Sequence, residues 1–193
     1  MAATAARKAL RAHLTGFFGE HTIAEREWTL GPIRTRVPDF VVYEIGPGPR
    51  LRGCWTYVTS GCWAATARDG HGLEFVLSAT NASVRHIECL AMTAYYHAGP
   101  EEQRLDWGLT VPIGEPWTAG SLCTYDLISL PYVYGPDLEI CRWECGHIRI
   151  LATMPITEAE RNFKVTHGIE ALEQRFDQAK IAFADPHRPS VID

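Results

Sequence analysis

The stretch that decides the fold reads Cys145-Gly146-His147-Ile148-Arg149-Ile150-Leu151-Ala152-Thr153-Met154-Pro155-Ile156-Thr157-Glu158-Ala159-Glu160. Its first half is rich in aliphatic and β-branched residues, which is typical of a buried strand, and we expect Pro155 to end that strand. Thr157 and Glu160 then form a Thr-x-x-Glu capping box, in which each side chain accepts a hydrogen bond from the other residue's amide. A helix is therefore predicted to begin at this box.

The chain after this box continues as one predicted helix. Four apolar residues recur at spacings of four, three and four: Val165, Ile169, Leu172 and Phe176. That spacing places them on one face of the helix, with polar residues over the rest of its surface. We expect the strand and this helix to close the core.

Two further helices are predicted nearer the N-terminus. The first runs from Thr4 to Phe18, where Gly19 can end it. The second begins after Ser83, a residue type that caps helices, and stops at Gly99-Pro100.

Extended segments account for much of the remaining chain. The residue patterns predict them at 27–33, 40–45, 54–59, 73–79, 106–116, 121–130 and 138–143. Because Asp69-Gly70 is a tight-turn pair, the strands at 54–59 and 73–79 are expected to be neighbours. Glu144-Cys145-Gly146 is a predicted hairpin turn into the opening stretch.

Strands and helices do not alternate strictly along the chain, and this order indicates the α+β class. We expect a mostly antiparallel sheet packed with about three helices. The predicted organisation is an N-terminal helix at 1–20, the main domain at 21–180 and a tail at 181–193. The tail is expected to fray because Asp185-Pro186-His187-Arg188-Pro189 has no core-forming pattern.

The composition is that of an ordinary globular protein of 193 residues, with 21% charged residues and a net charge of −5. This balance does not favour nucleic acid or an anionic membrane, and it mildly favours a basic partner. No apolar run has the length of a signal peptide or of a membrane span, so a cytoplasmic location is expected. The cysteines are scattered rather than clustered, which indicates reduced, mostly buried thiols.

Cys141, Cys145 and His147 form the one group that resembles a metal site. Alternation along a strand places Cys141 and His147 on opposite faces, and no fourth ligand is evident, so neither a metal nor another cofactor is predicted. A nucleophile among Cys62, Cys123 and Cys145 would need a histidine close to it in space, and nothing in the sequence pairs one with any of them. A cysteine- or metal-dependent enzyme remains the alternative function, and no catalytic residue is predicted.

Aromatic residues are dense near the predicted turns, and most of them are expected to be structural. Tyr and Trp also serve as interface anchors, because they combine a large apolar area with a polar atom. Tyr132 and Tyr134 lie in a loop between Pro131 and Pro136 and are the best candidates for exposure. With acidic neighbours included, the predicted partner-binding residues are Trp117, Tyr132, Tyr134, Asp137, Glu139 and Trp143.

Several short motifs, taken in order, resemble the suppressor of fused family in its bacterial, single-domain branch. They are Gly53-Cys54-Trp55-Thr56-Tyr57-Val58-Thr59-Ser60-Gly61, Gly72-Leu73-Glu74-Phe75-Val76-Leu77, Leu130-Pro131 and the strand and capping box from Leu151 to Glu160. The resemblance covers roughly residues 28 to 178. The chain departs from the pattern at Cys62-Trp63, where family members usually carry an aliphatic residue and a serine.

The resemblance implies a suppressor-of-fused-like fold and a non-catalytic protein-binding domain. In bacteria such domains look like immunity proteins of polymorphic toxin systems, so the implied partner is a cognate protein toxin domain. A general intracellular adaptor is a second alternative. No nucleic-acid or membrane partner is expected, and the oligomeric state is left open.

Overall fold

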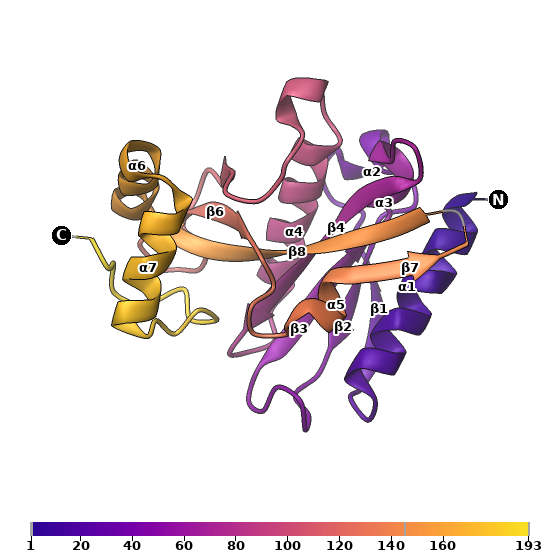
Figure 1. Ribbon diagram of the computed structural model, residues 1–193, viewed down its shortest axis with the longest axis horizontal. Helices are drawn as coiled ribbons and strands as arrows, with labels where there is room; N and C mark the ends of the chain where they lie inside the picture. The colour runs from indigo at the N-terminus through magenta and orange to yellow at the C-terminus, as the bar shows by residue number, and fades with distance from the viewer. Residues whose placement is uncertain (1, 145, 193) are drawn as a thin grey trace.

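The computed structural model describes residues 2–144 and 146–192. These residues form an eight-stranded sheet in the order β1-β2-β3-β4-β8-β6-β5, with β7 also paired to β8 (Figure 1). The strands are β1 (Ile23–Glu27), β2 (Val41–Ile45), β3 (Trp55–Ser60), β4 (His71–Ala79), β5 (Thr110–Pro112), β6 (Cys123–Ser129), β7 (Ile140–Trp143) and β8 (Gly146–Thr157). Only the β4–β8 pair is parallel within this part of the chain. The predicted α+β class with a mostly antiparallel sheet is confirmed.

Seven α-helices lie in the described residues, more than the three expected, because three of the seven are short single turns and the last predicted helix is divided in two. The helices are α1 (Ala2–Phe18), α2 (Ile33–Arg36), α3 (Cys62–Thr66), α4 (Val84–His97), α5 (Pro136–Glu139), α6 (Glu158–His167) and α7 (Ile169–Ala179). A 3-10 turn covers Glu101–Gln103. None of the helices described is both long and apolar enough to cross a bilayer.

Helices cover both faces of the sheet. Successive residues of a strand point to opposite faces, so neighbouring residues of one strand contact different helices. In β4, Phe75 joins the cluster that contains the buried side chains of α4, while Val76 joins the cluster that contains those of α1. A third, smaller cluster packs Leu172 and Phe176 of α7 against β6 and β8. Figure 1 shows α1 near one end of the molecule and α6 and α7 at the other, with β8 running between them.

The two capped helices begin where the sequence predicts. The hydroxyl of Ser83 accepts a hydrogen bond from the Arg85 amide at the start of α4. At the start of α6, Thr157 Oγ1 accepts from the Glu160 amide and the Glu160 carboxylate accepts from the Thr157 amide. The predicted α1 and the β3–β4 neighbours are also confirmed.

Pro155 does not end β8, contrary to expectation, and the strand continues to Thr157. The reason lies in the pairing: β4 accompanies β8 only as far as Thr153, whereas β6 continues past Asp126, the partner of Pro155. Beyond Thr153 the strand has a neighbour on one side only, and a residue without an amide hydrogen is tolerated at such an edge.

The single helix predicted after the capping box is two helices. Gly168 separates α6 from α7 with φ at +90°, a conformation that favours glycine. The change of direction leaves Val165 62% exposed, while Leu172 and Phe176 remain in the core. The four apolar residues that suggested one helix face therefore belong to two helices, Val165 to α6 and the other three to α7.

Two predicted strands are also partly wrong. Residues 27–33 were expected to be extended, but β1 ends at Glu27 and α2 begins at Ile33, after the Gly31-Pro32 turn. The segment 138–143 begins inside α5, whose first residue is Pro136, and only its second half forms β7. The β7 and β8 strands pair antiparallel as the predicted hairpin requires, but Cys145 in its turn lies outside the described residues.

The C-terminal segment packs against the domain rather than fraying, as far as residue 192. Arg188 is only 4% exposed, and Ala184 is also buried. The sequence gives little sign of this packing, because the main anchor of the segment is not an apolar residue. It is the charged side chain of Arg188, which binds the buried Glu160.

Candidate functional site

A groove with a volume of about 520 Å³ opens between the loop after β6 and helix α7. Its floor is formed by Val76 of β4 with Ala152 and Met154 of β8. One wall is the loop at 130–134, and the other includes Phe176 and Asp177 of α7. We call this the Tyr132 groove. Its volume is within the range of about 300–1,000 Å³ that is usual for ligand sites.

The sheet itself places the loop over the groove. β6 pairs with β8 as far as Ala152, and β7 resumes the pairing on the same side at Arg149. The chain between these two strands leaves the sheet at this point and passes over its face. The loop is therefore held at both ends by hydrogen-bonded strands.

Tyr134 anchors this loop from below, and the expectation that it is exposed is wrong. Its side chain is 7% exposed, and its hydroxyl lies 2.9 Å from Thr56 Oγ1 and 2.5 Å from Ser78 Oγ. Burial raises the pKa of Tyr134 to about 12, although the two hydroxyl partners oppose the shift. The ring also packs edge-on against Phe17 and Phe18 of α1. Tyr134 is thus part of the core in this conformation.

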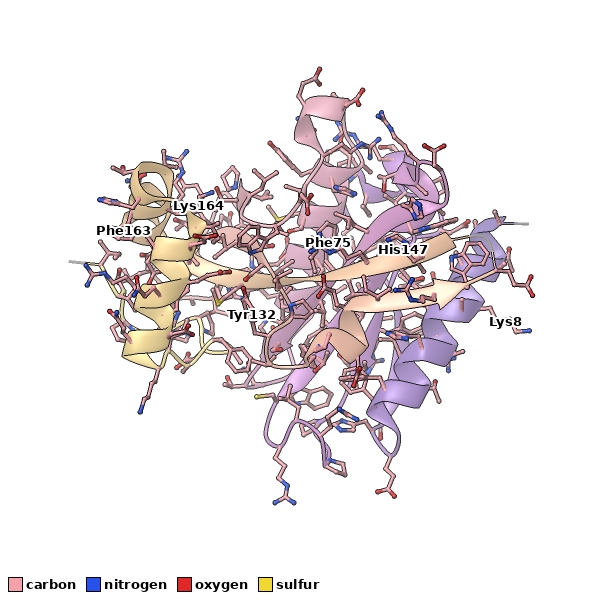
Figure 2. The ribbon with its side chains drawn as sticks, viewed as in Figure 1. Lys8, Phe75, Tyr132, His147, Phe163 and Lys164 are labelled. Carbon is pink, nitrogen blue, oxygen red and sulfur yellow. The ribbon has the colours of Figure 1, made fainter. Side chains whose placement is uncertain are left out.

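Tyr132 stands at the surface of the groove, as predicted, beside α7 (Figure 2). Its side chain is 61% exposed, and the adjacent Val133 is 42% exposed. The Tyr132 hydroxyl donates to Glu173 Oε2 at 3.1 Å. Partial burial, followed by the negative charges of Glu173, Asp177 and Glu139, raises the pKa of Tyr132 to about 12.

Glu173 joins the loop to α7 and was not predicted as a site residue. Its other carboxylate oxygen, Oε1, accepts hydrogen bonds from Ser129 Oγ at 2.9 Å and from Trp107 Nε1 at 3.2 Å. In the sequence Glu173 is one of several polar residues on the exposed side of a helix. Its role depends on where α7 docks, and no local signal carries that information.

The other predicted partner residues do not line the groove. Trp117 is 1% exposed and its Nε1 donates to His86 Nδ1 at 3.3 Å, so it belongs to the core under α4. Trp143 is half-buried and packs edge-on against Trp63. Asp137 is exposed on α5, and Glu139 accepts from Arg149 Nε at 2.8 Å.

The cysteine and histidine group is not assembled in the described part of the chain. Cys141 is buried in the cluster under α1. His147 lies on the opposite face of β8, where its ring packs at a tilt of 36° against His71, with ring centroids 4.3 Å apart. Figure 2 places His147 near the β7 end of β8, away from Tyr132. Cys145 lies outside the described residues, and no cluster of three metal-ligating side chains occurs among those described.

The thiols considered as nucleophiles are buried, and burial works against their activation. Burial raises the pKa of Cys62 well above its ordinary value, and the neighbouring carboxylate of Glu74 raises it further. Burial likewise raises the pKa of Cys123. A thiol with a raised pKa is less often in the thiolate form that attacks substrates.

The motifs at residues 53–61 and 72–77, which carry the family resemblance, meet at Glu74. Its buried carboxylate accepts hydrogen bonds from Thr59 Oγ1 at 2.6 Å and from the amides of Gly61 and Trp63 at 2.9 and 3.0 Å. Gly61 has φ at +123°, and a Cβ there would lie 3.0 Å from Val37 Cγ1. These motifs therefore form a buried polar junction between β3, β4 and α3, on which the packing of the sheet depends.

The chain matches known proteins over most of its length. The model of the family described as "Suppressor of fused protein (SUFU)" matches residues 37–189. The solved structure of a suppressor of fused homologue from Neisseria gonorrhoeae FA 1090 is 36% identical, with 97% of each chain covered and a TM-score of 0.82. A search among curated proteins finds no relative of this chain.

Two more distant structures share the fold. A chain of the Sufu-Fu complex is 12% identical, with a TM-score of 0.75 and coverage of 96% of this chain and 92% of that one. Drosophila Suppressor of Fused is 13% identical, with a TM-score of 0.72, and this chain covers 51% of its length. The family match and the identity to the Neisseria homologue together show that the chain belongs to the suppressor of fused family.

Proposed function

We propose that this protein is a non-catalytic immunity protein of the cytoplasm, which neutralises a cognate toxin domain by binding it in a stoichiometric complex. Membership of the suppressor of fused family and the 36% identity to a bacterial homologue support a protein-binding role. The observation that carries the proposal is the exposed pair Tyr132 and Val133 at the edge of a preformed groove. The partner would seat on this face.

Tyr132 has the features of an aromatic anchor at a protein interface. Tyr132 offers a large ring whose hydroxyl is already held by Glu173, so little side-chain entropy is lost when a partner covers it. The loop is fixed below by the buried Tyr134, which makes the surface largely preorganised. Anchors of this kind contribute most of the binding free energy in many interfaces.

The charge of the protein supports a basic partner. The chain carries a net charge of −5, and Asp177 and Glu173 line the Tyr132 groove. An acidic inhibitor that approaches a basic toxin gains association rate from electrostatic steering, and the gain falls as salt is added.

Co-expression tests the proposal directly. Where a large secreted protein is encoded immediately upstream of this gene, the probe is its C-terminal domain, expressed in a host that it kills. We expect co-expression of the full chain to restore growth and the two purified proteins to form a 1:1 complex. Failure to restore growth, or growth without a complex, would contradict neutralisation by binding.

Surface variants locate the interface within the same assay. Tyr132→Ala combined with Val133→Asp is expected to abolish rescue, whereas Val84→Ala should leave it intact. Val84 is the matched control because it is 66% exposed on α4 and does not line the groove. Recovery of an endogenous protein but no toxin from the native host would instead favour the adaptor alternative.

A further inference from the structure

The Tyr132 groove combines an apolar floor with acidic groups on one wall. Val76, Ala152 and Met154 supply the floor, while Glu173 and Asp177 come from successive turns of α7. Such a surface does not suit a purely apolar ligand, which would bury the carboxylates without giving them a counter-charge. It does not suit an acidic ligand either.

Among the residues that the structure describes, the acidic groups of this wall have no salt-bridge partner. The nine salt bridges of the described residues involve neither Glu173 nor Asp177. Lys180 also lines the groove, but its ammonium pairs with neither carboxylate in that set. Other carboxylates, such as Glu25 and Glu44, are paired with arginines. What sets Glu173 and Asp177 apart is that they lie beside an apolar groove.

The field of these carboxylates reaches the tyrosine at the opening of the groove. Burial is the largest cause of the raised pKa of Tyr132, and the negative charges of Glu173, Asp177 and Glu139 raise it further. Of the three, Glu139 is already paired with Arg149, and Glu173 is held by hydroxyl and indole donors. Asp177 is exposed and is left as the group most able to accept a new cation.

We propose that the Tyr132 groove binds a partner segment in which an apolar side chain is followed closely by a lysine or arginine. The apolar side chain lies on the floor against Ala152 and Met154, and the cationic group reaches Asp177 and Glu173 beside Tyr132. This inference rests on the proposed function, since it assigns the chemistry of the toxin segment that enters the groove.

Three matched peptides test the chemistry on the full-length protein. The first is Gly-Ser-Leu-Arg-Leu-Arg-Ser-Gly, the second replaces both arginines with glutamate, and the third replaces both leucines with serine. Binding is followed by chemical-shift changes in the ¹⁵N-labelled protein at up to millimolar peptide. We expect the first peptide to shift Tyr132, Ala152 and Phe176, and to bind about tenfold more tightly than either control, which is a free-energy difference within the range of a single charge pair or anchor.

A pair of charge reversals on one helix provides the matched protein control. Asp177→Lys is expected to weaken binding of the arginine peptide roughly tenfold and to remove its salt dependence. Glu170→Lys makes the same charge change on the exposed first turn of α7, outside the groove, and should have a much smaller effect. Equal weakening by both variants would mean that only net charge matters and would overturn the proposal.

The remaining outcomes also decide the question. Equal binding of the glutamate peptide, absence of binding at millimolar peptide, or shifts confined to residues outside the groove would each overturn the inference. If the toxin is neutralised while the arginine peptide fails, the proposed function stands and only the assigned chemistry is wrong. If the peptide binds as expected but no toxin is neutralised, the groove chemistry stands and the immunity role fails.

Discussion

The guanidinium of Arg188 binds the carboxylate of Glu160 through two contacts, Nη1–Oε1 at 2.6 Å and Nη2–Oε2 at 2.8 Å, with both side chains almost fully buried. Arg188 Nη2 also donates to the carbonyl of Pro155 at 3.1 Å. One arginine therefore joins the C-terminal segment to the end of β8 and to the first turn of α6. Glu160 serves the capping box at the same time.

Replacing this arginine is expected to destabilise the whole domain. Arg188→Ala leaves a buried, unpaired carboxylate, and breaking one side of a buried pair typically costs roughly 3–5 kcal/mol. Urea unfolding followed by circular dichroism measures the change in the free energy of unfolding. Arg52→Ala, at an exposed loop position, is the control and should change it by less than about 0.5 kcal/mol. A similar small change in both variants would show that the pair contributes little.

Asp126 is expected to make the protein less stable as the pH rises. Burial raises the pKa of this carboxyl to about 8, against the opposing hydrogen bond from Thr93 Oγ1 at 2.7 Å, whereas an unfolded aspartate has a pKa of about 3.9. The folded state therefore binds more protons between these values, and stability is lost as the pH rises through that window at up to about 1.4 kcal/mol per pH unit.

The Asp126→Asn variant isolates this effect, because asparagine keeps the shape and an acceptor for Thr93. Free energies of unfolding measured between pH 6.5 and 8 should fall more steeply with pH in the parent protein than in the variant. Both proteins contain the buried histidines His86 and His97, so the difference between the two curves isolates Asp126. Parallel curves for the two proteins would contradict the raised pKa.

His97 is expected to act in the opposite direction at lower pH. Burial, and then the charge of Arg104, lowers its pKa to about 4. Its Nδ1 accepts from the Leu105 amide at 2.9 Å, so the neutral ring is the form that fits the site. The unfolded state binds more protons between pH 6.5 and 4, and stability that is present above this window is lost as the pH falls through it. His97→Gln should flatten the decline in that range, measured by the same unfolding titration, and an unchanged slope would argue against it.

Substitutions at Tyr132 and Tyr134 are expected to change different properties, although the two residues are only two positions apart. Tyr132→Ala should weaken partner binding by more than about 1 kcal/mol, measured by calorimetry, with little loss of stability. Tyr134→Phe leaves the hydroxyls of Thr56 and Ser78 without their buried partner, which should cost about 1 kcal/mol of stability while affinity is kept. A loss of affinity in the Tyr134 variant with stability unchanged would reverse these roles.

Local signals in the sequence predicted the elements that depend on local chemistry. The capping box of Thr157 and Glu160 forms because both partners lie within one helical turn. The Asp69-Gly70 turn, where both residues have positive φ, closes the bridge between Arg68 and His71. It leads into β4, which pairs with β3 although α3 lies between the two strands. In each case the residues that make the interaction are close together in the chain.

The parts that sequence reasoning missed depend on residues that are distant in the chain. Tyr134 is buried because α1, which precedes it by more than a hundred residues, packs over the same face of the sheet. Glu173 becomes a site residue only through contacts with Trp107, Ser129 and Tyr132. Arg188 is an anchor only because Glu160 is buried beside it. The sequence therefore predicted that both tyrosines lie in a loop, but not which of them faces solvent.

The position of β8 has a consequence for how this protein is made. β8 is the only strand in the described sheet that joins the β1–β4 half to the β6–β5 half, and it comes last in the chain. While the ribosome is still adding these final residues, β4 and β6 are open edges, which are prone to pair with other chains. The floor of the Tyr132 groove takes Val76 from one half and Ala152 and Met154 from β8 itself. The groove, whose other wall is α7, is therefore complete only after β8 and α7 have both been synthesised.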